Sequence, residues 1–300
     1  MNLQKNLQDN LLHCSLLVQK KIIELLTTNK KTSNLIEAMR YSALSGGKRI
    51  RPFLVMACAN LFDISDLKAL NAAVAVELLH TYSLIHDDLP AMDNDDFRRN
   101  QPTCHKKFDE ATAILAGDAL LTLSFELLSD VQTHKDAAIR CDLIITLAKA
   151  SGMNGMVGGQ MIDLEVTSKK LTNEELVNLH RLKTGELFMA SAEFGAILGY
   201  ANTQQRNALR YYAHDLGLAF QIKDDILDYF GIENSKITID EHHQNKSKDN
   251  ASVVDIVGIR QANQQLEMLK DQAITHLKIF DNQRIKPLVE LVEFVVSRKA

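Results

Sequence analysis

Apolar side chains recur at every third or fourth position along most of this chain, which is the spacing of an amphipathic helix. Helical patterns cover residues 3–28, 33–44, 52–61, 72–88, 111–128, 137–150, 173–199 and 203–230, and they resume from residue 253 to the C-terminus. Ser33 can cap one of these helices, and Pro52 suits the first turn of another. Pro90 should end the helix over residues 72–88, which is apolar on most faces and so belongs at the centre of a bundle.

Two stretches depart from this periodicity. Residues 152–160 read GMNGMVGGQ, so we expect the backbone there to lie close to another helix or a ligand, with Gly158 and Gly159 permitting helix packing. Residues 233–250 are polar and aperiodic, which predicts a mobile surface loop that is long enough to act as a lid. No stretch has the composition of a linker. We therefore predict one domain over residues 1–300, with an all-α fold built as a single large helical bundle around a central cavity.

Composition and charge narrow the class of protein. Apolar residues make up 46% of the 300 positions, and the counts of 13 glycines and 4 prolines are low, as suits a helical core. The formal net charge of -4 argues against a broad nucleic-acid surface. The four cysteines form no CxxC pair, which argues against a disulfide framework or a zinc site and fits a reducing compartment. Because we find neither a signal peptide nor an apolar run of the ~20 residues that a membrane span needs, we expect a cytoplasmic protein with no membrane span.

The densest cluster of charged side chains lies in residues 82–105, directly after an apolar helix. It contains Asp87, Asp88 and Asp93, followed by Arg98 and Arg99. Carboxylates at the end of a buried helix repel one another unless a cation pairs them, and Mg²⁺ takes such oxygen ligands together with substrate phosphates. Arginine suits phosphate oxygens. The cluster thus indicates a metal-bound phosphate or diphosphate, with a solvated acidic loop as the alternative.

A second acidic cluster lies inside the helical pattern of residues 203–230. Asp224 and Asp228 are four positions apart, so they share one helix face, and Asp225 lies beside them. One DDxxD sequence is a weak signal, because it is also common on solvated surfaces. Two such clusters, each preceded by an apolar helix, are a stronger signal. If they faced each other across a bundle core, they could hold several divalent ions.

Five motifs in order along the chain carry a resemblance to a known family. They are GGKRIRP at 46–52, YSLIHDDLPAMDNDDFRR at 82–99, GMVGGQMIDL at 155–164, HRLKTGELF at 180–188 and FQIKDDILD at 220–228. Through these five motifs the chain resembles the bacterial farnesyl diphosphate synthases, which belong to the trans-isoprenyl diphosphate synthase family. The resemblance covers residues 46–231, and it implies the all-α isoprenoid synthase fold.

The resemblance assigns the aspartates to a metal site. In the family they bind three Mg²⁺ ions on the diphosphate of an allylic substrate, with Mn²⁺ as a possible substitute, and each ion neutralises charge on the leaving group. The positions that match are Asp87, Asp88, Asp93, Asp224, Asp225 and Asp228. Arg98, Lys183 and Lys236 would hold the same diphosphate.

The resemblance also assigns residues to the two reacting carbons. The Lys183 carbonyl, the Thr184 hydroxyl and the Gln221 amide would lie near the allylic cation, where oriented dipoles stabilise charge without trapping it. The second substrate, isopentenyl diphosphate, needs a cationic pocket without metal. The positions that match this pocket are Lys48, Arg51, His80 and Arg99. The departing diphosphate would take the final proton, so no protein base is required.

Several of these positions have simpler explanations. Lys183 could be a surface lysine, and His80 a satisfied core histidine. Arg49 is expected to be a surface ion-pair partner rather than a ligand, and His86 either orients a neighbour or is only a helix residue. Asn100 departs from the glycine usual in the family, but asparagine tolerates a positive φ.

The loop after the second acidic cluster departs further from the family. Lys236 can match the first lysine expected there, but Asn250 stands at the position of the second. Lys246 or Lys248 could substitute for it. The sequence therefore does not assign the contacts that would close this loop over the site. The aspartates of the metal site are unaffected by this departure.

Product length can be argued from the helix that precedes Asp87. Tyr82 lies about 7.5 Å further down that helix at 1.5 Å per residue. A tyrosine there would stop chain growth early, while Ser83 would leave lateral room. We expect farnesyl diphosphate, made from dimethylallyl diphosphate by way of geranyl diphosphate.

Other functions remain open at this point. A geranylgeranyl or geranyl diphosphate synthase of the same family is the nearest alternative, and a non-catalytic helical regulatory subunit is another. A terpene cyclase would not need Lys48, Arg51 and Arg99. The family is usually a homodimer, and we carry that over as an expectation.

Overall fold

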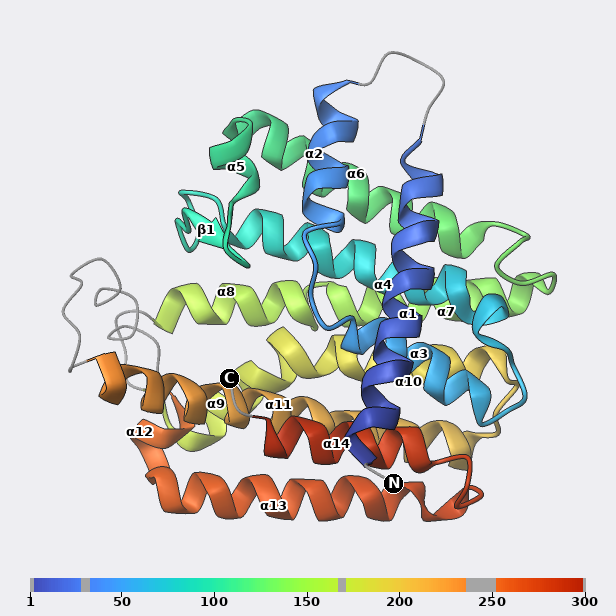
Figure 1. Cartoon of the computed structure of the whole chain (residues 1–300), viewed down its shortest axis with the longest axis vertical. Helices are drawn as coiled ribbons and strands as arrows, with labels where there is room; N and C mark the ends of the chain where they lie inside the picture. Colours follow the sequence, from blue (N-terminus) through green and yellow to red (C-terminus); the bar gives the residue numbers. More distant parts are fainter. Residues whose placement is uncertain (1–2, 28–32, 167–170, 236–251, 299–300) are drawn as a thin grey trace. The chain divides into compact units, whose positions relative to one another are not determined.

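The computed structural model in Figure 1 describes residues 3–27, 33–166, 171–235 and 252–298. The prediction of an all-α fold is confirmed, since two-residue strands are the only strands among these residues. Most of the predicted surface loop, together with Lys236, Lys246, Lys248 and Asn250, lies outside the described residues.

The helices follow the predicted pattern closely. They are α1 Leu3–Leu25, α2 Asn34–Ala43, α3 Ile50–Asn60, α4 Asp66–Asp87, α5 Cys104–Lys107, α6 Glu110–Ser129, α7 Ala137–Ser151, α8 Met156–Val166, α9 Asn173–His180, α10 Glu186–Leu198, α11 Thr203–Ser235, α12 Val253–Val257, α13 Ile259–His276 and α14 Lys286–Ser297. Ser33 caps α2 as expected, because its side chain accepts a hydrogen bond from the Ile36 amide. Helix α4 ends at Asp87, three residues before Pro90.

Two boundaries differ from the prediction. Helix α4 begins at Asp66 rather than near Ala72, with Ser65 as its N-cap residue. The pattern over residues 173–199, read as one helix, contains a π-helical turn at Arg181–Gly185 between α9 and α10. The sequence pattern did not predict this turn.

Contacts between Cα atoms divide the chain into two compact units. Unit 1 comprises Met1–Thr146 and Phe194–Tyr200, and unit 2 comprises Leu147–Glu193 and Ala201–Ala300. Helices α7 and α10 each contribute residues to both units. The single domain expected from the sequence stays a prediction.

Unit 1 is built around α4. This helix packs against α1, α3 and α6, and α2 packs against α4 and α6. Residues 72–76, 78 and 79 of α4 are completely buried, which confirms the central position predicted for an all-round apolar helix. Helix α4 therefore supplies a rigid rod whose C-terminal end carries the first acidic cluster.

A short antiparallel hairpin follows α4. Strand β1 Phe97–Arg98 pairs with β2 Gln101–Pro102 through a two-residue turn. Both turn residues, Arg99 and Asn100, have positive φ angles of 53° and 60°, as a type I′ turn requires. The expectation that Asn100 tolerates this conformation is confirmed.

Unit 2 is built around the long helix α11. Helices α9, α12, α13 and α14 pack against it, and α13 and α14 also pack against each other (Figure 1). A buried cluster that includes Ile222, Ile226, Val253, Leu266 and Val296 joins α11 to α12, α13 and α14. This packing fixes the face of α11 that carries the second acidic cluster.

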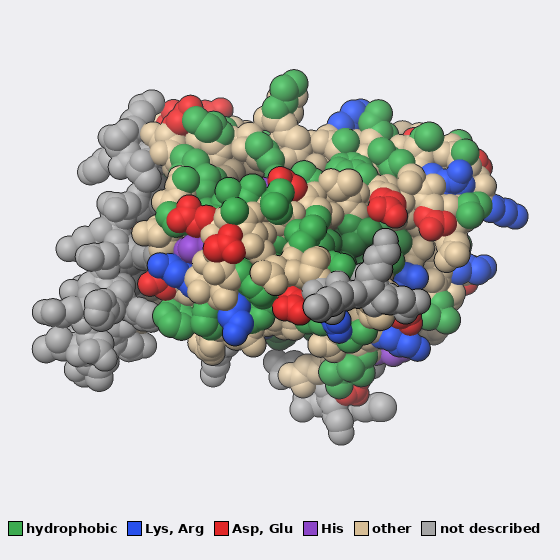
Figure 2. All heavy atoms as spheres, turned by 90° about the horizontal axis from the view of Figure 1, so that it is seen from above, with side chains coloured by type: hydrophobic (Ala, Val, Ile, Leu, Met, Phe, Trp, Pro, Cys, Tyr) green, Lys and Arg blue, Asp and Glu red, His purple; other side chains and the backbone are tan. Residues whose placement is uncertain are grey.

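Helix α6 is unusually apolar for its exposure. By length and composition it is the one described helix that could cross a membrane, although the sequence analysis expected none, and 39% of its apolar window is buried. Core helices meet the same criteria, so one such helix is weak evidence for a span. Its exposed residues include Ile114 and Leu115, and Figure 2 shows how apolar side chains lie between charged ones on one face of the molecule.

Candidate active site

The first acidic cluster folds back on the end of α4. The Asp93 amide donates a hydrogen bond to the Asp87 carbonyl at 2.8 Å, and the Asp95 amide donates to the Asp88 carbonyl at 3.2 Å. These bonds bring Asp93 next to Asp87 although six residues separate them in sequence. Asp87 is half-buried and Asp93 is exposed, so both carboxylates lie where a hydrated cation can reach them.

Asp88 has a different environment from its neighbours. Its side chain is buried, and Arg98 donates to its Oδ1 from Nε at 2.7 Å and from Nη2 at 2.6 Å. Burial raises the pKa of Asp88, while the bonds from Arg98 oppose that rise. The two residues predicted to bind metal and diphosphate therefore bind each other in unit 1, and their predicted roles stay predictions.

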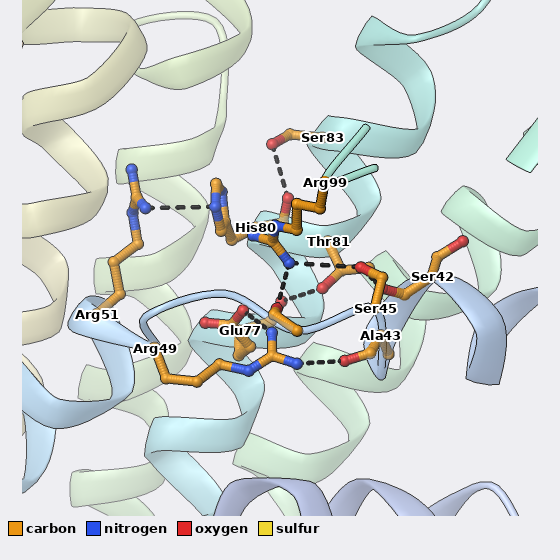
Figure 3. Close-up of polar contacts among 11 residues, drawn as sticks. Ser42, Ala43, Ser45, Arg49, Arg51, Glu77, His80, Thr81, Ser83 and Arg99 are labelled. Atoms are coloured by element: carbon orange, nitrogen blue, oxygen red, sulfur yellow. Dashed lines mark hydrogen bonds and ion pairs between the residues drawn. The ribbon is translucent and has the colours of Figure 1, made fainter. Parts of the chain in front are cut away.

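The basic residues of unit 1 lie together beside α4, as Figure 3 shows for Arg51, His80 and Arg99. Arg51 Nη1 lies 3.3 Å from His80 Nε2, and Arg99 donates to the Gly46 carbonyl. Burial, followed by the charges of the nearby arginines, lowers the pKa of His80 well below its ordinary value. His80 is therefore neutral at pH 7, and because a guanidinium only donates, its Nε2 is the acceptor and Nδ1 carries the proton. Lys48 is exposed on the same loop.

Arg49 does not lie at the surface, so that expectation is wrong. Its side chain is only 2% exposed, and Nη1 pairs with Oε1 of Glu77, which is itself buried on α4. The Nη2 group donates to the Ala43 carbonyl at 2.6 Å. The sequence does not reveal this pair, because the two residues lie 28 positions apart and Glu77 stands alone in an apolar helix.

Tyr82 has a neighbour that sets its orientation. Its ring meets the His86 ring edge to face, with centroids 5.0 Å apart. His86 in turn lies 3.1 Å from the Ile114 carbonyl of α6, and a Cβ at Gly117 would come within 2.2 Å of its Nε2. Of the two alternatives for His86, the contacts favour orientation of a neighbour. Ser83 is half-buried, and its hydroxyl donates to the His80 carbonyl at 2.9 Å.

The second acidic cluster lies on α11 in unit 2, and its three carboxylates have different partners. Asp225 accepts from the Val253 amide at 2.8 Å and from the Gln221 amide at 3.4 Å, so both of its oxygens are hydrogen-bonded. Burial raises its pKa to about 6. Burial also raises the pKa of Asp228, which the Arg298 charge opposes. Asp225 thus ties α12 to α11, which sequence reasoning did not anticipate.

Asp224 has a partner from the C-terminal end of the chain. Arg298 donates from Nη2 to Asp224 Oδ1 at 2.6 Å and to the Phe220 carbonyl at 3.0 Å. Its guanidinium carbon also lies 4.2 Å from the centre of the Phe220 ring. Arg298 therefore supplies positive charge to the acidic cluster, from a position 74 residues away in sequence.

The residues predicted near the allylic cation meet in unit 2. Lys183 and Thr184 belong to the π-helical turn, and the Thr184 hydroxyl donates to Gln221 Oε1 at 3.2 Å. Lys183 Nζ forms an ion pair with Asp163 of α8 at 2.5 Å, so the explanation as a free surface lysine fails. The structure thus brings Lys183, Thr184 and Gln221 onto two packed elements. Turns of this kind occur often at functional sites.

Residues 155–164 hold two groups that sequence reasoning did not assign. One is Asp163, the partner of Lys183. The other is Gln160, which is 9% exposed and whose Oε1 and Nε2 have no hydrogen-bond partner among the described residues. A buried amide in this state is expected to bind water or a ligand. Gly159 has the packing role expected of it, because a Cβ there would lie 2.4 Å from the Lys183 backbone nitrogen.

The donor set suits a hard cation that arrives with its substrate. No group of three or more His, Cys, Asp or Glu side chains within residues 3–27, 33–166, 171–235 and 252–298 is arranged to hold a metal by itself. Mg²⁺ commonly uses one or two carboxylates and completes its shell with water and phosphate. Asp87 and Asp93 in unit 1 fit that pattern, and protein groups donate hydrogen bonds to Asp88, Asp224 and Asp225. Whether the two clusters face each other stays a prediction.

Comparisons with known proteins agree with these features. The sequence profile described as polyprenyl synthetase matches residues 32–291. The farnesyl diphosphate synthase of Escherichia coli strain K12 is 42% identical over 269 residues, which cover 88% of this chain and 89% of that enzyme. Geranylgeranyl pyrophosphate synthase 4 of Arabidopsis thaliana is 40% identical over 268 residues, which cover 88% of this chain and 71% of that one.

A solved structure confirms the fold expected from the resemblance. The apo crystal structure of a FPP/GFPP synthase from Zymomonas mobilis is 40% identical to this chain, with a TM-score of 0.88, and the match covers 98% of this chain and all of that one. The family profile and these relatives span both acidic clusters and the basic loop. The chain belongs to the polyprenyl synthetase family.

Proposed function

We propose that this protein is a prenyltransferase that condenses dimethylallyl or geranyl diphosphate head to tail with isopentenyl diphosphate and releases farnesyl diphosphate. The observation that carries the proposal is the arrangement along α4. An aspartate pair, Asp87 and Asp93, lies at its C-terminal end, and a separate basic cluster of Arg51, His80 and Arg99 lies beside its middle. A prenyl elongation needs two diphosphate sites, one with metal and one without.

The chain's own residues perform distinct tasks in this reaction. Asp87 and Asp93 would bind Mg²⁺, as would Asp224 and Asp228, and the bound ions supply Lewis-acid stabilisation of the departing diphosphate. Lys183, held by Asp163, presents a positive charge in unit 2.

The Thr184 hydroxyl and the Gln221 amide form a fixed dipole pair that can stabilise a carbocation. Neutral His80 has a proton on Nδ1 to donate to a phosphate oxygen, while Arg51 holds its Nε2. A general base on the protein is not needed, because the released diphosphate can accept the proton lost from the product.

The fifteen-carbon product is supported by Tyr82. The contact with His86 holds its ring in one orientation on α4, one helical turn and a half before Asp87. A second candidate is a geranylgeranyl diphosphate synthase, which the similarity to the Arabidopsis thaliana enzyme of that name favours. The two candidates differ only in where chain growth stops.

One assay separates these candidates. Purified protein is incubated with Mg²⁺, dimethylallyl diphosphate and isopentenyl diphosphate, and the products are dephosphorylated and resolved by chain length. Farnesol as the main product supports the proposal, and geranylgeraniol supports the second candidate. If no diphosphate is released in this assay, the protein is not a prenyltransferase, and the regulatory-subunit alternative gains support.

We further propose that the enzyme works as a homodimer in a reducing compartment. Helix α6 exposes Ile114 at 44% and Leu115 at 57%, and an apolar face of this kind is better covered by a second copy than left in water. All four cysteines are free, with Cys14, Cys58 and Cys104 buried, which supports a compartment that keeps thiols reduced.

A further inference from the structure

The end of the α2–α3 loop and the first turn of α3 supply three cations, Lys48, Arg49 and Arg51, and the middle one turns inward. Arg49 adopts a left-handed backbone conformation with a φ of 49°. It is 4% exposed, whereas Lys48 beside it is exposed. A strained backbone angle and a buried guanidinium are both costly, and they persist only where the surrounding structure requires them. The burial of Arg49 therefore calls for a role.

The partners of Arg49 tie three elements together. One guanidinium nitrogen pairs with Glu77 in the middle of α4, and another donates to the Ala43 carbonyl at the end of α2. Arg49 itself immediately precedes α3. Figure 3 shows the side chain lying between the α2–α3 loop and α4, with Glu77 beside it. The ion pair thus fixes where the loop attaches to α4.

The place of attachment determines the geometry of the basic cluster. Glu77 and His80 are three residues apart on α4, so they lie on the same side of that helix. Arg49 and Arg51 are two residues apart at the start of α3. Pairing Arg49 with Glu77 therefore places Arg51 beside His80, where the Nη1 to Nε2 distance is 3.3 Å.

A second arginine holds the same loop from outside. Arg99, from the turn of the hairpin, donates to the Gly46 carbonyl and lies 3.4 Å from the Ser45 hydroxyl. The Arg99 guanidinium lies directly against the loop, since a Cβ at Gly47 would be 2.7 Å from its carbon atom. The loop is thus fixed at two points, and both points are arginines.

The two arginines that fix the loop, Arg49 and Arg99, differ in whether an acid pairs with them. Figure 3 labels the arginines Arg49, Arg51 and Arg99 together with the acid Glu77. Glu77 contacts only Arg49 of the three in the described hydrogen bonds and ion pairs. The Glu77 carboxylate thus offsets the charge of the inward arginine, Arg49.

We propose that the buried Arg49–Glu77 ion pair positions Arg51, His80 and Arg99 to bind the diphosphate of a metal-free, homoallylic substrate. The inference rests on the proposed function, since it names the site for isopentenyl diphosphate. Arg49 and Glu77 are positioning residues. Arg49 contacts Glu77 and the Ala43 carbonyl, so the pair acts through the loop and α4 and does not contact the substrate itself.

The test replaces the pair as a unit. The double variant Arg49→Met with Glu77→Leu removes both charges and fills the site with apolar groups, which avoids leaving one buried charge alone. Arg49→Lys keeps the charge and loses the planar fork that reaches both Glu77 and Ala43. The matched control is Arg206→Met, which removes one ion-pair partner of the buried Glu193 in unit 2.

Two measurements are made on each variant. Initial rates with geranyl diphosphate and Mg²⁺ give the KM for each substrate and kcat. Calorimetric titration with isopentenyl diphosphate in the presence of a chelator gives its affinity without turnover.

The double variant is expected to raise the KM and Kd for isopentenyl diphosphate about tenfold or more, with the KM for geranyl diphosphate and kcat within about twofold of the parent. Arg49→Lys should have an intermediate KM and Kd for isopentenyl diphosphate, and Arg206→Met should lower only thermal stability.

A folded double variant with the parental Kd for isopentenyl diphosphate overturns the inference, as does an equal rise in KM for both substrates. If the double variant does not fold, a parental Kd of Arg49→Lys for isopentenyl diphosphate overturns the inference instead. Absence of prenyl transfer by the parent protein would instead overturn the proposed function.

Discussion

His180 lies immediately before the π-helical turn and is buried in unit 2. Burial, with a smaller contribution from Lys183, lowers its pKa from 6.5 to about 4, while Asp163 opposes the shift. Between these two values the unfolded chain binds a proton at this position and the folded chain does not. The free energy of unfolding should therefore fall as the pH is lowered from 6.5 to 4, by up to about 3 kcal/mol from this residue.

The check is the stability of parent and His180→Gln proteins by urea unfolding at pH 7 and pH 5. Glutamine does not titrate, so the variant should lose less free energy of unfolding between the two pH values than the parent. The difference between pH values is compared, since the substitution also changes packing. Equal losses in the two proteins would assign the acid sensitivity to other groups.

Tyr82 provides the second prediction for a single residue. Tyr82→Ala removes the ring that His86 supports on α4, and this should let chain growth continue past fifteen carbons. Chromatography of the dephosphorylated products should then show chains of twenty carbons or more.

Tyr211→Ala is the matched control. Tyr211 is 58% exposed on α11, so its removal should leave product length unchanged. If Tyr82→Ala gives the same chain lengths as the parent, Tyr82 is not the floor of the pocket.

At the scale of elements, the contact between α8 and the π-helical turn depends on one glycine. A Cβ at Gly159 would lie 2.4 Å from the Lys183 backbone nitrogen, so Gly159→Ala must push the two elements apart. Overpacking of this kind costs about 1–3 kcal/mol. The displacement would also move Lys183 and Thr184, so both the melting temperature and kcat should fall.

The matched control is Gly231→Ala in the exposed part of α11. No atom of the described residues lies within 4 Å of a Cβ at that position, so alanine should raise stability by about 0.5–1 kcal/mol through helix propensity alone. Thermal unfolding of the two alanine variants should thus shift in opposite directions. A shift of the same sign in both would contradict the packing argument.

The hydrophobic pattern located nearly every described helix, and it missed two features of the elements. It placed the start of α4 six residues too late, because the first turn of that helix is amphipathic rather than apolar. It also could not detect the π-helical turn at Arg181–Gly185. That turn is decided by packing against α8 and α11, which local periodicity does not encode.

At the scale of the whole molecule, the exposed face of α6 predicts association. Leu115→Arg places a charge in the surface that we propose to be covered by a second copy. Light scattering after gel filtration should show the parent as a dimer and the variant with about half its mass, because burying an unpaired charge is costly.

Leu67→Arg is the control for this experiment. Leu67 is the more exposed of the two leucines, at 71%, and lies in the first turn of α4. The control should keep the parental mass. A parent protein that is monomeric at micromolar concentration would remove the basis for the dimer.

The sequence by itself determined the helical class, the Ser33 cap of α2 and the position of the two acidic clusters on or beside helices. These properties follow from local spacing, since residues such as Asp224 and Asp228 must share a face of any helix that contains them. It also determined the family, because five motifs in order are a specific pattern.

Only the tertiary structure decided which partner each charged side chain has. Asp88 pairs with Arg98, Asp224 with Arg298, and Arg49 turns inward to Glu77. Partners such as the last two lie far apart in the chain, and a buried charge must be satisfied by whatever group packing brings to it. For that reason neighbouring aspartates of one cluster, such as Asp224 and Asp225, have different environments. For the same reason Arg49, which was expected at the surface, lies in the core.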